Sequence, residues 1–248
     1  MALKTDYFDG NLKLILPIVP TNTDELVSQA KAACDYHPDM IEWRADWFDD
    51  IAKKPVYEKA IKDLREIAGE IPILCTLRDY EENGHQPIGQ AEKRNAIEDM
   101  VRSGLIDVVD IELSHGKEYI HQLTDLAHQY DVKVLVAYHA KETPDENGIL
   151  SIMRQEYDFG ADILKFAFTP QSYADVVRLS KVVLEAKKDW LDRPVLSISS
   201  GEKGMISRIA GKALGTDMTF ASIGKTMQVH ISDLRDLEKI IQRYYSSN

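Results

Sequence analysis

Eight short apolar runs recur along the chain and predict eight β-strands. Most of them are continuously apolar and rich in β-branched residues, which is typical of parallel strands that are covered on both faces. The runs are Leu12–Pro20, Met40–Asp46, Ile71–Arg78, Val108–Leu113, Lys133–His139, Asp162–Phe168, Val195–Ser200 and Met218–Gly224.

The segments between these runs have the spacing of amphipathic helices. Thr23 is the expected N-cap of the first helix, with Asp24 and Glu25 in its opening turn. The apolar faces comprise Leu26, Val27, Ala30, Ala33 and Cys34 in the first helix, and Leu234, Leu237, Ile240, Ile241 and Tyr244 in the last. A strand followed by a helix, eight times in succession, predicts a single α/β domain over residues 1–248 with the fold of a (β/α)8 TIM barrel.

Two further features refine this prediction. A doubly wound open sheet is the alternative, but no Gly-x-Gly-x-x-Gly follows the first strand. Asp9-Gly10 is a turn signal just before the first strand, and it predicts a small N-terminal hairpin that closes the bottom of the barrel.

The charge balance narrows the classes of partner. The 248-residue chain has 30 lysines and arginines against 41 aspartates and glutamates, a formal net charge of −11, which argues against nucleic acid or a membrane surface as partners. No apolar stretch approaches the roughly 20 residues of a membrane span, and the first six residues lack an apolar signal core. Two cysteines, Cys34 and Cys75, are too few for a disulfide framework, which favours a reducing, cytoplasmic compartment.

Charged residues gather at the predicted carboxyl ends of the strands, where such barrels carry their chemistry. Alternation along the second strand turns Glu42, Arg44 and Asp46 into the barrel and leaves Trp43 and Ala45 facing the helices. The other strand ends contribute Arg78, Asp110, Glu112, Tyr138, His139, Lys165, Ser199 and Ser200, with Arg208 close behind. Burying so many charges costs more desolvation than stability alone explains, so we expect a polar ligand site.

Lys165 is the most informative of these residues, because it lies inside the apolar run Asp162–Phe168. An ammonium is rarely buried without a partner, and burial beside arginines favours the neutral amine. A neutral amine in an apolar pocket attacks carbonyl carbons and forms Schiff bases. The structural alternative is a lysine that reaches solvent or pairs with a carboxylate.

The other members of the set have structural interpretations as well. His139 alone is typical of a hydrogen-bonded residue at a strand end. The candidate structural ion pairs are Glu42–Arg44 and Asp46–Arg78, with Asp110 and Glu112 as further partners for interior cations. A divalent metal on Glu42, Glu112 and His139 is disfavoured, since two arginines and a lysine would surround it with positive charge.

Five segments together resemble the type I 3-dehydroquinate dehydratases, the Schiff-base enzymes of the shikimate pathway. They are Glu42-Trp43-Arg44-Ala45-Asp46, Thr76-Leu77-Arg78, Tyr138-His139, Asp162-Ile163-Leu164-Lys165-Phe166-Ala167 and Gly204-Met205-Ile206-Ser207-Arg208. They occur in the family's order with compatible spacing, and the likeness extends over essentially the whole chain.

The resemblance implies a (β/α)8 barrel that dehydrates 3-dehydroquinate to 3-dehydroshikimate without a metal or other cofactor. It implies that Lys165 condenses with the C3 ketone of the substrate, that His139 transfers protons and that Glu82 orients His139. The substrate-binding residues that it implies are Arg208 for the carboxylate, Glu42, Arg44 and Arg78 for the hydroxyls and ring, and Gln228 for the loop that covers the site.

The chain departs from the family in that last loop. The family usually has Ser-Ala-Pro-Gly-Gln, whereas this chain has Gly224-Lys225-Thr226-Met227-Gln228. A hydroxyl, a proline and a glycine are therefore missing, and Lys225 adds a charge near the mouth of the site.

Two other functions stay open on the sequence. Lys165 also fits another imine-forming barrel lyase, such as a class I aldolase. The altered loop is compatible with a barrel that senses a shikimate-pathway acid without converting it. Exposed apolar positions on the later helices are compatible with a homodimer.

Overall fold

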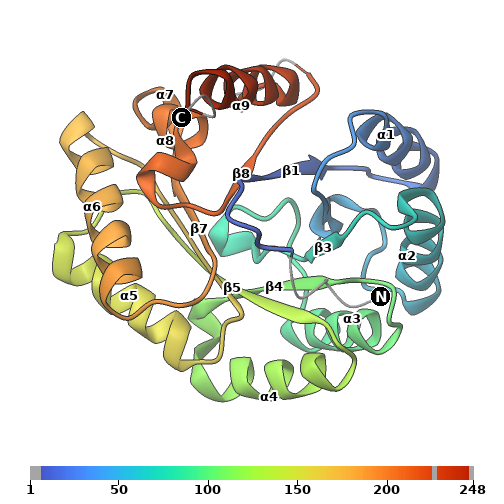
Figure 1. Ribbon diagram of the computed structural model, residues 1–248. Coiled ribbons are helices and arrows are strands. Elements are labelled where there is room, and N and C mark those ends of the chain that lie inside the picture. Colours follow the sequence, from blue (N-terminus) through green and yellow to red (C-terminus); the bar gives the residue numbers. More distant parts are fainter. Residues whose placement is uncertain (1–6, 225–227, 246–248) are drawn as a thin grey trace.

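The computed structural model, which describes residues 7–224 and 228–245, confirms a nearly closed eight-stranded parallel barrel (Figure 1). Hydrogen-bonded neighbours follow the order β7-β6-β5-β4-β3-β2-β1-β8. The strands are β1 (Lys13–Ile18), β2 (Met40–Arg44), β3 (Ile73–Thr76), β4 (Val108–Glu112), β5 (Lys133–Ala140), β6 (Ile163–Phe168), β7 (Val195–Ser199) and β8 (Met218–Phe220). Each strand lies within its predicted run, except that β5 extends one residue beyond it.

The seam between β7 and β8 is held by the segment that leads into β8. The backbone N–H of Asp217 donates to the carbonyl of Val195 at 2.8 Å, and Oδ2 of Asp217 accepts from the N–H of Val195 at 2.7 Å. The Thr216 hydroxyl adds a bond to the same Val195 carbonyl at 2.9 Å. Side chains therefore complete the cylinder where the strand ladder is interrupted.

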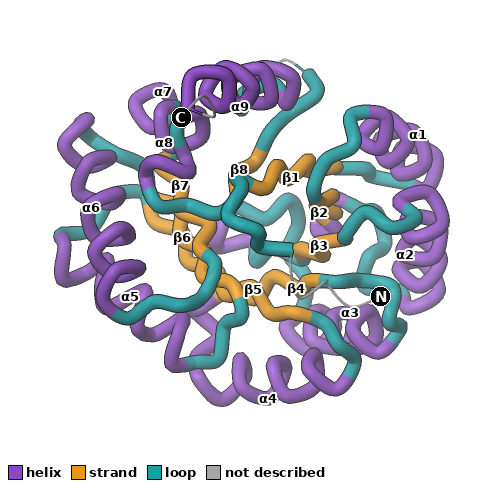
Figure 2. Tube along the Cα trace, in the orientation of Figure 1, coloured by secondary structure: helices purple, strands orange, loops and turns teal. Residues whose placement is uncertain are grey.

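Helices form a ring around the barrel and follow one another in chain order (Figure 2). The long ones are α1 (Thr23–Asp35), α2 (Lys54–Ala68), α3 (Gln90–Arg102), α4 (Gly116–Gln129), α5 (Glu146–Asp158), α6 (Tyr173–Asp189) and α9 (Ile231–Tyr245). Two short helices follow β7, α7 (Gly201–Gly204) and α8 (Ile206–Ile209). Single 3-10 turns occur at η1 (Ala45–Trp47), η2 (Tyr80–Glu82), η3 (Leu113–His115) and η4 (Gly211–Leu214).

On β2, β4 and β6 the inward-facing residues change from apolar to charged along the strand. Val108 belongs to the apolar cluster inside the barrel, and Asp110 and Glu112 follow on the same face of β4. On β6, Ile163 in the same cluster is followed by Lys165. The lower interior is therefore a packed apolar plug, and the charged groups collect above it at the carboxyl end.

The outward-facing residues pack against the helices, as the alternation along β2 predicts. Trp43 and Ala45 are fully buried in the cluster between strands and helices, together with Trp43's edge-on neighbour Phe48. This confirms that Glu42 and Arg44 face the interior.

Two local predictions need correction. Asn22, and not Thr23, is the N-cap of α1, and its side chain accepts from the N–H of Glu25 at 3.0 Å. Residues 7–12 contain no strand, so the N-terminal hairpin is not found in this part of the described chain. The turn at Asp9-Gly10 does form, with Gly10 at φ +83°, but Tyr7 and Phe8 close the barrel bottom by packing on its apolar plug.

The apolar face of α9 is buried at its start and exposed toward its end. Leu234 is buried and Leu237 half-buried, whereas Ile240 and Ile241 are about half exposed. The side chain of Tyr244 lies outside the described residues. Within residues 7–224 and 228–245, none of the helices combines the length and apolar character that a membrane crossing requires.

Glu156 on α5 is a buried acid that costs the fold stability. It is 0% exposed, and neither carboxyl oxygen has a hydrogen-bond partner among the described residues. Burial raises the pKa of Glu156 well above its usual value of 4.5. As pH rises above 4.5, the carboxyl group of Glu156 loses its proton in the unfolded chain but keeps it in the folded protein, so folding becomes less favourable.

We expect Glu156→Met to raise the free energy of unfolding by about 1–3 kcal/mol at neutral pH, because it removes an unpartnered buried polar group at similar volume. Glu156→Gln is the control that stays polar but cannot ionise. Its stability relative to wild type should increase as pH rises above 4.5, as measured by urea unfolding. A destabilised Glu156→Met protein, or a Glu156→Gln difference that is constant with pH, would contradict this assignment.

Candidate active site

A cavity of about 280 Å³ opens at the carboxyl end of the barrel. Its lining includes all eight residues predicted from the sequence: Glu42, Arg44, Arg78, Glu82, His139, Lys165, Arg208 and Gln228. Pro17, Val19, Asn83, Ala167, Ile198, Ser200 and Phe220 complete it. Residues from six strand ends and three loops thus converge on one small, mostly polar space.

Lys165 is 3% exposed and reaches this cavity from the middle of β6. Its Nζ lies 2.6 Å from Oδ2 of Asp110, and 5.3 Å from the centre of the Phe220 ring. The structure therefore gives Lys165 a carboxylate partner, which is the structural alternative that the sequence left open, and a contact of this length favours the charged form. The lysine is paired, but it also faces space that a ligand can enter.

Asp110 is shared between two cations. Nη2 of Arg78 donates to the same Oδ2 at 2.7 Å. Burial raises the pKa of Asp110, but Arg78 and Lys165 outweigh it, and the pKa lies below its usual value. Oδ1 of Asp110 is buried without a hydrogen-bond partner in the described part of the chain. The acid therefore has one oxygen that already binds two cations and a second that is unused.

His139, at the end of β5, lies against Glu82 from the loop after β3. Nδ1 of His139 is 2.9 Å from Oε2 of Glu82, and the Ser114 hydroxyl donates to the other oxygen of Glu82 at 2.8 Å. Burial lowers the pKa of His139 well below its usual value, and the charges of Arg78 and Lys165 lower it further. A neutral ring with its proton on Nδ1 leaves Nε2 as the free base.

Arg208 carries the unsatisfied charge of the site. Its Nη1 is buried and has no hydrogen-bond partner among residues 7–224 and 228–245, and burial lowers its pKa. The neighbouring Ser207 hydroxyl accepts from the Ser199 N–H at 3.0 Å and donates to the Gly204 carbonyl at 2.8 Å, which fixes the turn. A Cβ at Gly204 would lie 2.1 Å from the Ser199 carbonyl oxygen, so only glycine fits there. The turn holds an arginine fork ready for an anion.

The ion pairs differ from those expected on the sequence. Arg44 forms a two-pronged pair with Asp46, both bonds at 2.9 Å, in place of a bridge to Glu42. Asp46 is thus not the partner of Arg78, which binds Asp110 instead. Glu42 accepts a hydrogen bond from the Thr76 hydroxyl at 2.8 Å and keeps its place in the cavity wall.

Gln228, the last residue of the loop that departs from the family, lines the same cavity. The Ser222 hydroxyl donates to the carbonyls of Gly224 and Gln228 at 3.2 and 3.3 Å, which brings the two ends of the loop together. Lys225, and with it the predicted extra charge, lies outside the described residues, as do Thr226 and Met227.

Three charged residues next to the site, one buried and two half-buried, were missed. They are Asp79, Lys93 and His115, which form ion pairs behind Arg78. A signal for Lys93 does exist in the sequence, because it lies at helical spacing from Ala96, Ile97 and Met100, on the apolar face of α3.

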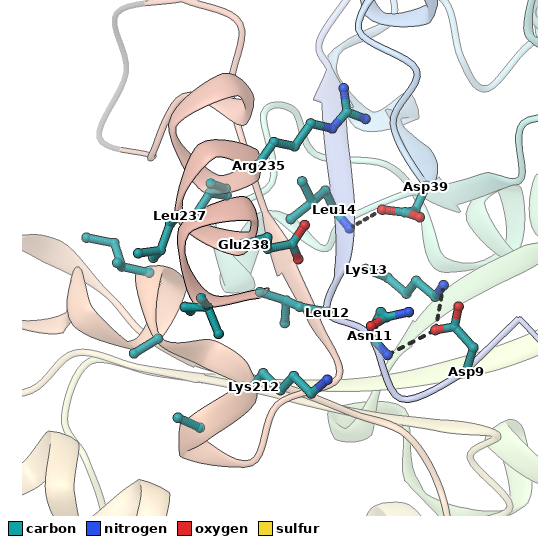
Figure 3. A pocket seen from close by; sticks show the side chains of 15 residues that line it. Asp9, Asn11, Leu12, Lys13, Leu14, Asp39, Lys212, Arg235, Leu237 and Glu238 are labelled. Atoms are coloured by element: carbon teal, nitrogen blue, oxygen red, sulfur yellow. Dashed lines mark hydrogen bonds and ion pairs between the residues drawn. The ribbon is translucent and has the colours of Figure 1, made fainter. Parts of the chain in front are cut away.

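A larger cavity of about 630 Å³ lies elsewhere, between α9 and the start of β1 (Figure 3). Leu14 and Lys13 of β1 line it from one side, and Arg235 and Glu238 of α9 from the other. Because the opposite end of β1 leads to Pro17 in the polar cavity, the two cavities lie at opposite ends of that strand. The larger cavity contains none of the predicted site residues.

Comparisons with known proteins agree with this arrangement. Residues 14–245 match the family model described as type I 3-dehydroquinase. A 3-dehydroquinate dehydratase of Bacillus licheniformis is 32% identical over 239 residues, which is 95% of this chain and 94% of that protein.

Two crystal structures are similar over the same extent. The 3-dehydroquinate dehydratase of Geobacillus kaustophilus superposes with a TM-score of 0.90 at 36% identity, covering 95% of this chain and 93% of that one. The type I enzyme of Clostridium difficile, with covalently modified comenic acid, gives a TM-score of 0.91 at 29% identity, covering 95% and 94%.

We expect the pKa values of His139 and His115 to differ from the usual value of histidine in opposite directions. The pKa of His139 lies well below 6.5, whereas Asp79 and then Glu112 raise the pKa of His115 to about 9. At neutral pH, His115 is then protonated and His139 neutral. NMR titration of the imidazole ring protons measures both, and His139→Gln and His115→Gln identify the signals. Two histidines that both titrate near 6.5 would show that the charges around them are misassigned.

Proposed function

The chain belongs to the type I 3-dehydroquinase family, and on that premise we propose that Lys165, His139 and Glu82 carry out the dehydration of 3-dehydroquinate to 3-dehydroshikimate. The observation that carries the proposal is one shared cavity. It contains a paired lysine amine, a neutral histidine and Arg208, whose buried Nη1 has no hydrogen-bond partner among the described residues. Those are the groups that a cyclic keto acid with a β-hydroxyl requires.

Binding is assigned to the cations and the loop that surround the lysine. Arg208 has the free donors to form a two-pronged pair with the substrate carboxylate. Glu42 and Arg44 provide an acceptor and donors for hydroxyl groups, and Arg44 is held in place by its pair with Asp46. Gln228, which follows β8 in the chain, lines the same cavity and adds an amide group to it.

The first chemical step forms the imine. Asp110, 2.6 Å from Nζ of Lys165, accepts a proton from the ammonium, and the freed lone pair attacks the ketone carbon. The resting ammonium carries three protons and the protonated imine one. The two that are lost leave with the carbonyl oxygen as water. A paired resting lysine is therefore compatible with Schiff-base chemistry, because the acid that stabilises its charge is also placed to take its proton.

The second step removes the hydroxyl. Nε2 of His139 takes a proton from the carbon next to the imine, and the electron pair moves into an enamine. The imidazolium then protonates the hydroxyl on the following carbon, which leaves as water as the double bond forms and the imine is restored. Glu82 stabilises the imidazolium between these two transfers. Hydrolysis of the imine releases the product and returns Lys165.

The family match favours this reaction over the two alternatives. Another imine-forming lyase would also use Lys165, but it has no need of a histidine oriented by a carboxylate beside an anion-binding arginine. A sensor of a shikimate-pathway acid would bind the acid without releasing product, so turnover decides between them.

We also propose a homodimer that functions in the cytoplasm. The support for a dimer is an exposed apolar stripe on α6, where Tyr173 and Val177 are each 67% exposed and Leu184 is 45% exposed. The support for the compartment is that Cys34 and Cys75 are free thiols.

Borohydride reduction in the presence of 3-dehydroquinate is expected to fix the substrate covalently on Lys165. Peptide mass spectrometry locates the label, and Lys165→Met should abolish both the label and turnover. His139→Gln should still be labelled but lose about 100- to 10,000-fold in kcat, because it removes only proton transfer. A label on another lysine, or near wild-type turnover by His139→Gln, would refute the assignment.

Val177→Lys is expected to convert the homodimer to a monomer without unfolding, because it places a charge in the exposed stripe of α6. Light scattering after gel filtration gives the mass of both proteins. Lys62→Glu, an exposed change on α2, is the control and should leave the mass unchanged. A wild-type protein that is monomeric at all concentrations would end the dimer proposal.

A further inference from the structure

Lys93 lies 2% exposed on the apolar face of α3, outside the barrel wall, with its ammonium directed toward the strand ends. Its Nζ is 2.6 Å from Oδ1 of Asp79 and 2.6 Å from Oε2 of Glu112. Burying an ammonium is costly, and an apolar side chain in its place is often as stable. Stability alone therefore does not account for this lysine.

His115 completes the cluster from the other side. Its Nε2 lies 2.9 Å from Oδ2 of Asp79 and 3.3 Å from Oε2 of Glu112, as ion pairs rather than well-aligned hydrogen bonds. Its ring stacks on Tyr119, which in turn contacts Arg94. Asp79, Glu112 and His115 have the spacing of a metal site, but the ammonium of Lys93 occupies the position between the two carboxylates.

The two carboxylates of the cluster hold two residues of the cavity. Oε1 of Glu112 accepts from Nη1 of Arg78 and from the backbone N–H of Asp79, both at 3.0 Å. Asp79 is the N-cap of η2, the turn that carries Glu82, the partner of His139. The position of Glu112 thus sets that of Arg78, and the position of Asp79 sets that of Glu82.

The loop between them is tight, so a shift of Asp79 reaches Glu82. The N–H of Gly84 donates back to the Asp79 carbonyl at 2.9 Å, and Asn83 has a left-handed φ of 68°. A Cβ at Gly84 would lie 2.3 Å from the Arg78 carbonyl oxygen. The turn from Asp79 to Gly84 therefore behaves as one rigid piece that is anchored at its start by Lys93 and His115.

We propose that Lys93, together with His115, is a positioning residue for the dehydration, which fixes Arg78 and the Glu82–His139 pair through Glu112 and Asp79. Neither side chain lines the cavity, so neither is assigned contact with substrate. This inference rests on the proposed function of the cavity.

The test compares Lys93→Met with the exposed control Lys62→Met in the full-length protein. Lys93→Met is expected to lower kcat/KM about 10- to 100-fold, since a displacement near 1 Å of a catalytic group has effects of that size. Displacement of Arg78 should raise KM, and displacement of His139 should lower kcat. Borohydride labelling of Lys165 should persist, because Lys165 is held by Asp110.

An NMR signal separates positioning from general destabilisation. The Nδ1 proton of His139, bonded to Glu82 at 2.9 Å, should give a downfield resonance in wild type and in Lys62→Met. That resonance should shift or vanish in folded Lys93→Met. If Lys93→Met does not fold, His115→Gln provides the same readouts with a smaller loss. The inference would be overturned if the variant that folds has the same kcat, KM and Nδ1 signal as the wild-type protein. If the wild-type protein itself does not turn over 3-dehydroquinate, the proposed function is overturned instead.

Discussion

The carboxylate of Asp110 is the point on which the site depends. One oxygen of this buried acid binds both Lys165 and Arg78, at 2.6 and 2.7 Å. Without that acid, two cations would be buried side by side, and each would raise the cost of the other. With it, the lysine stays ordered, faces the cavity and has a proton acceptor in contact.

The barrel makes this arrangement possible by separating apolar packing from charged groups along β2, β4 and β6. Apolar residues such as Val108 and Ile163 fill the lower interior, and the charged residues follow two positions later on the same face. The register places Thr76 of β3 beside Asp110 of β4. Because the strands are fixed by apolar packing below, the charges above can be arranged for function and not for stability.

Several features were predictable from the sequence because each depends on a local pattern. The eight strands follow from apolar runs, and the inward direction of Glu42 and Arg44 follows from alternation along β2. The convergence of Lys165 and His139 follows from their positions at strand ends, since the carboxyl ends of parallel strands meet at one face.

The ion pairs were not predictable, because they depend on register and on side chains from other elements. Arg44 pairs with Asp46 on its own segment, and Lys165 pairs with Asp110 two strands away. The prediction of an uncharged Lys165 weighed its burial without this partner. Lys93 was missed because a lysine in a helix is ordinarily exposed, and only its tertiary contacts show that it is not.

The most direct test of the account is the charge state of the Lys165 amine in the resting protein, read from NMR of its side-chain nitrogen at neutral pH with and without Asp110→Asn. The account predicts an ordered ammonium in the wild type, and its loss when the carboxylate becomes an amide. A neutral amine in the wild type, or an ammonium that is insensitive to Asp110→Asn, would show that the shared carboxylate does not control the site.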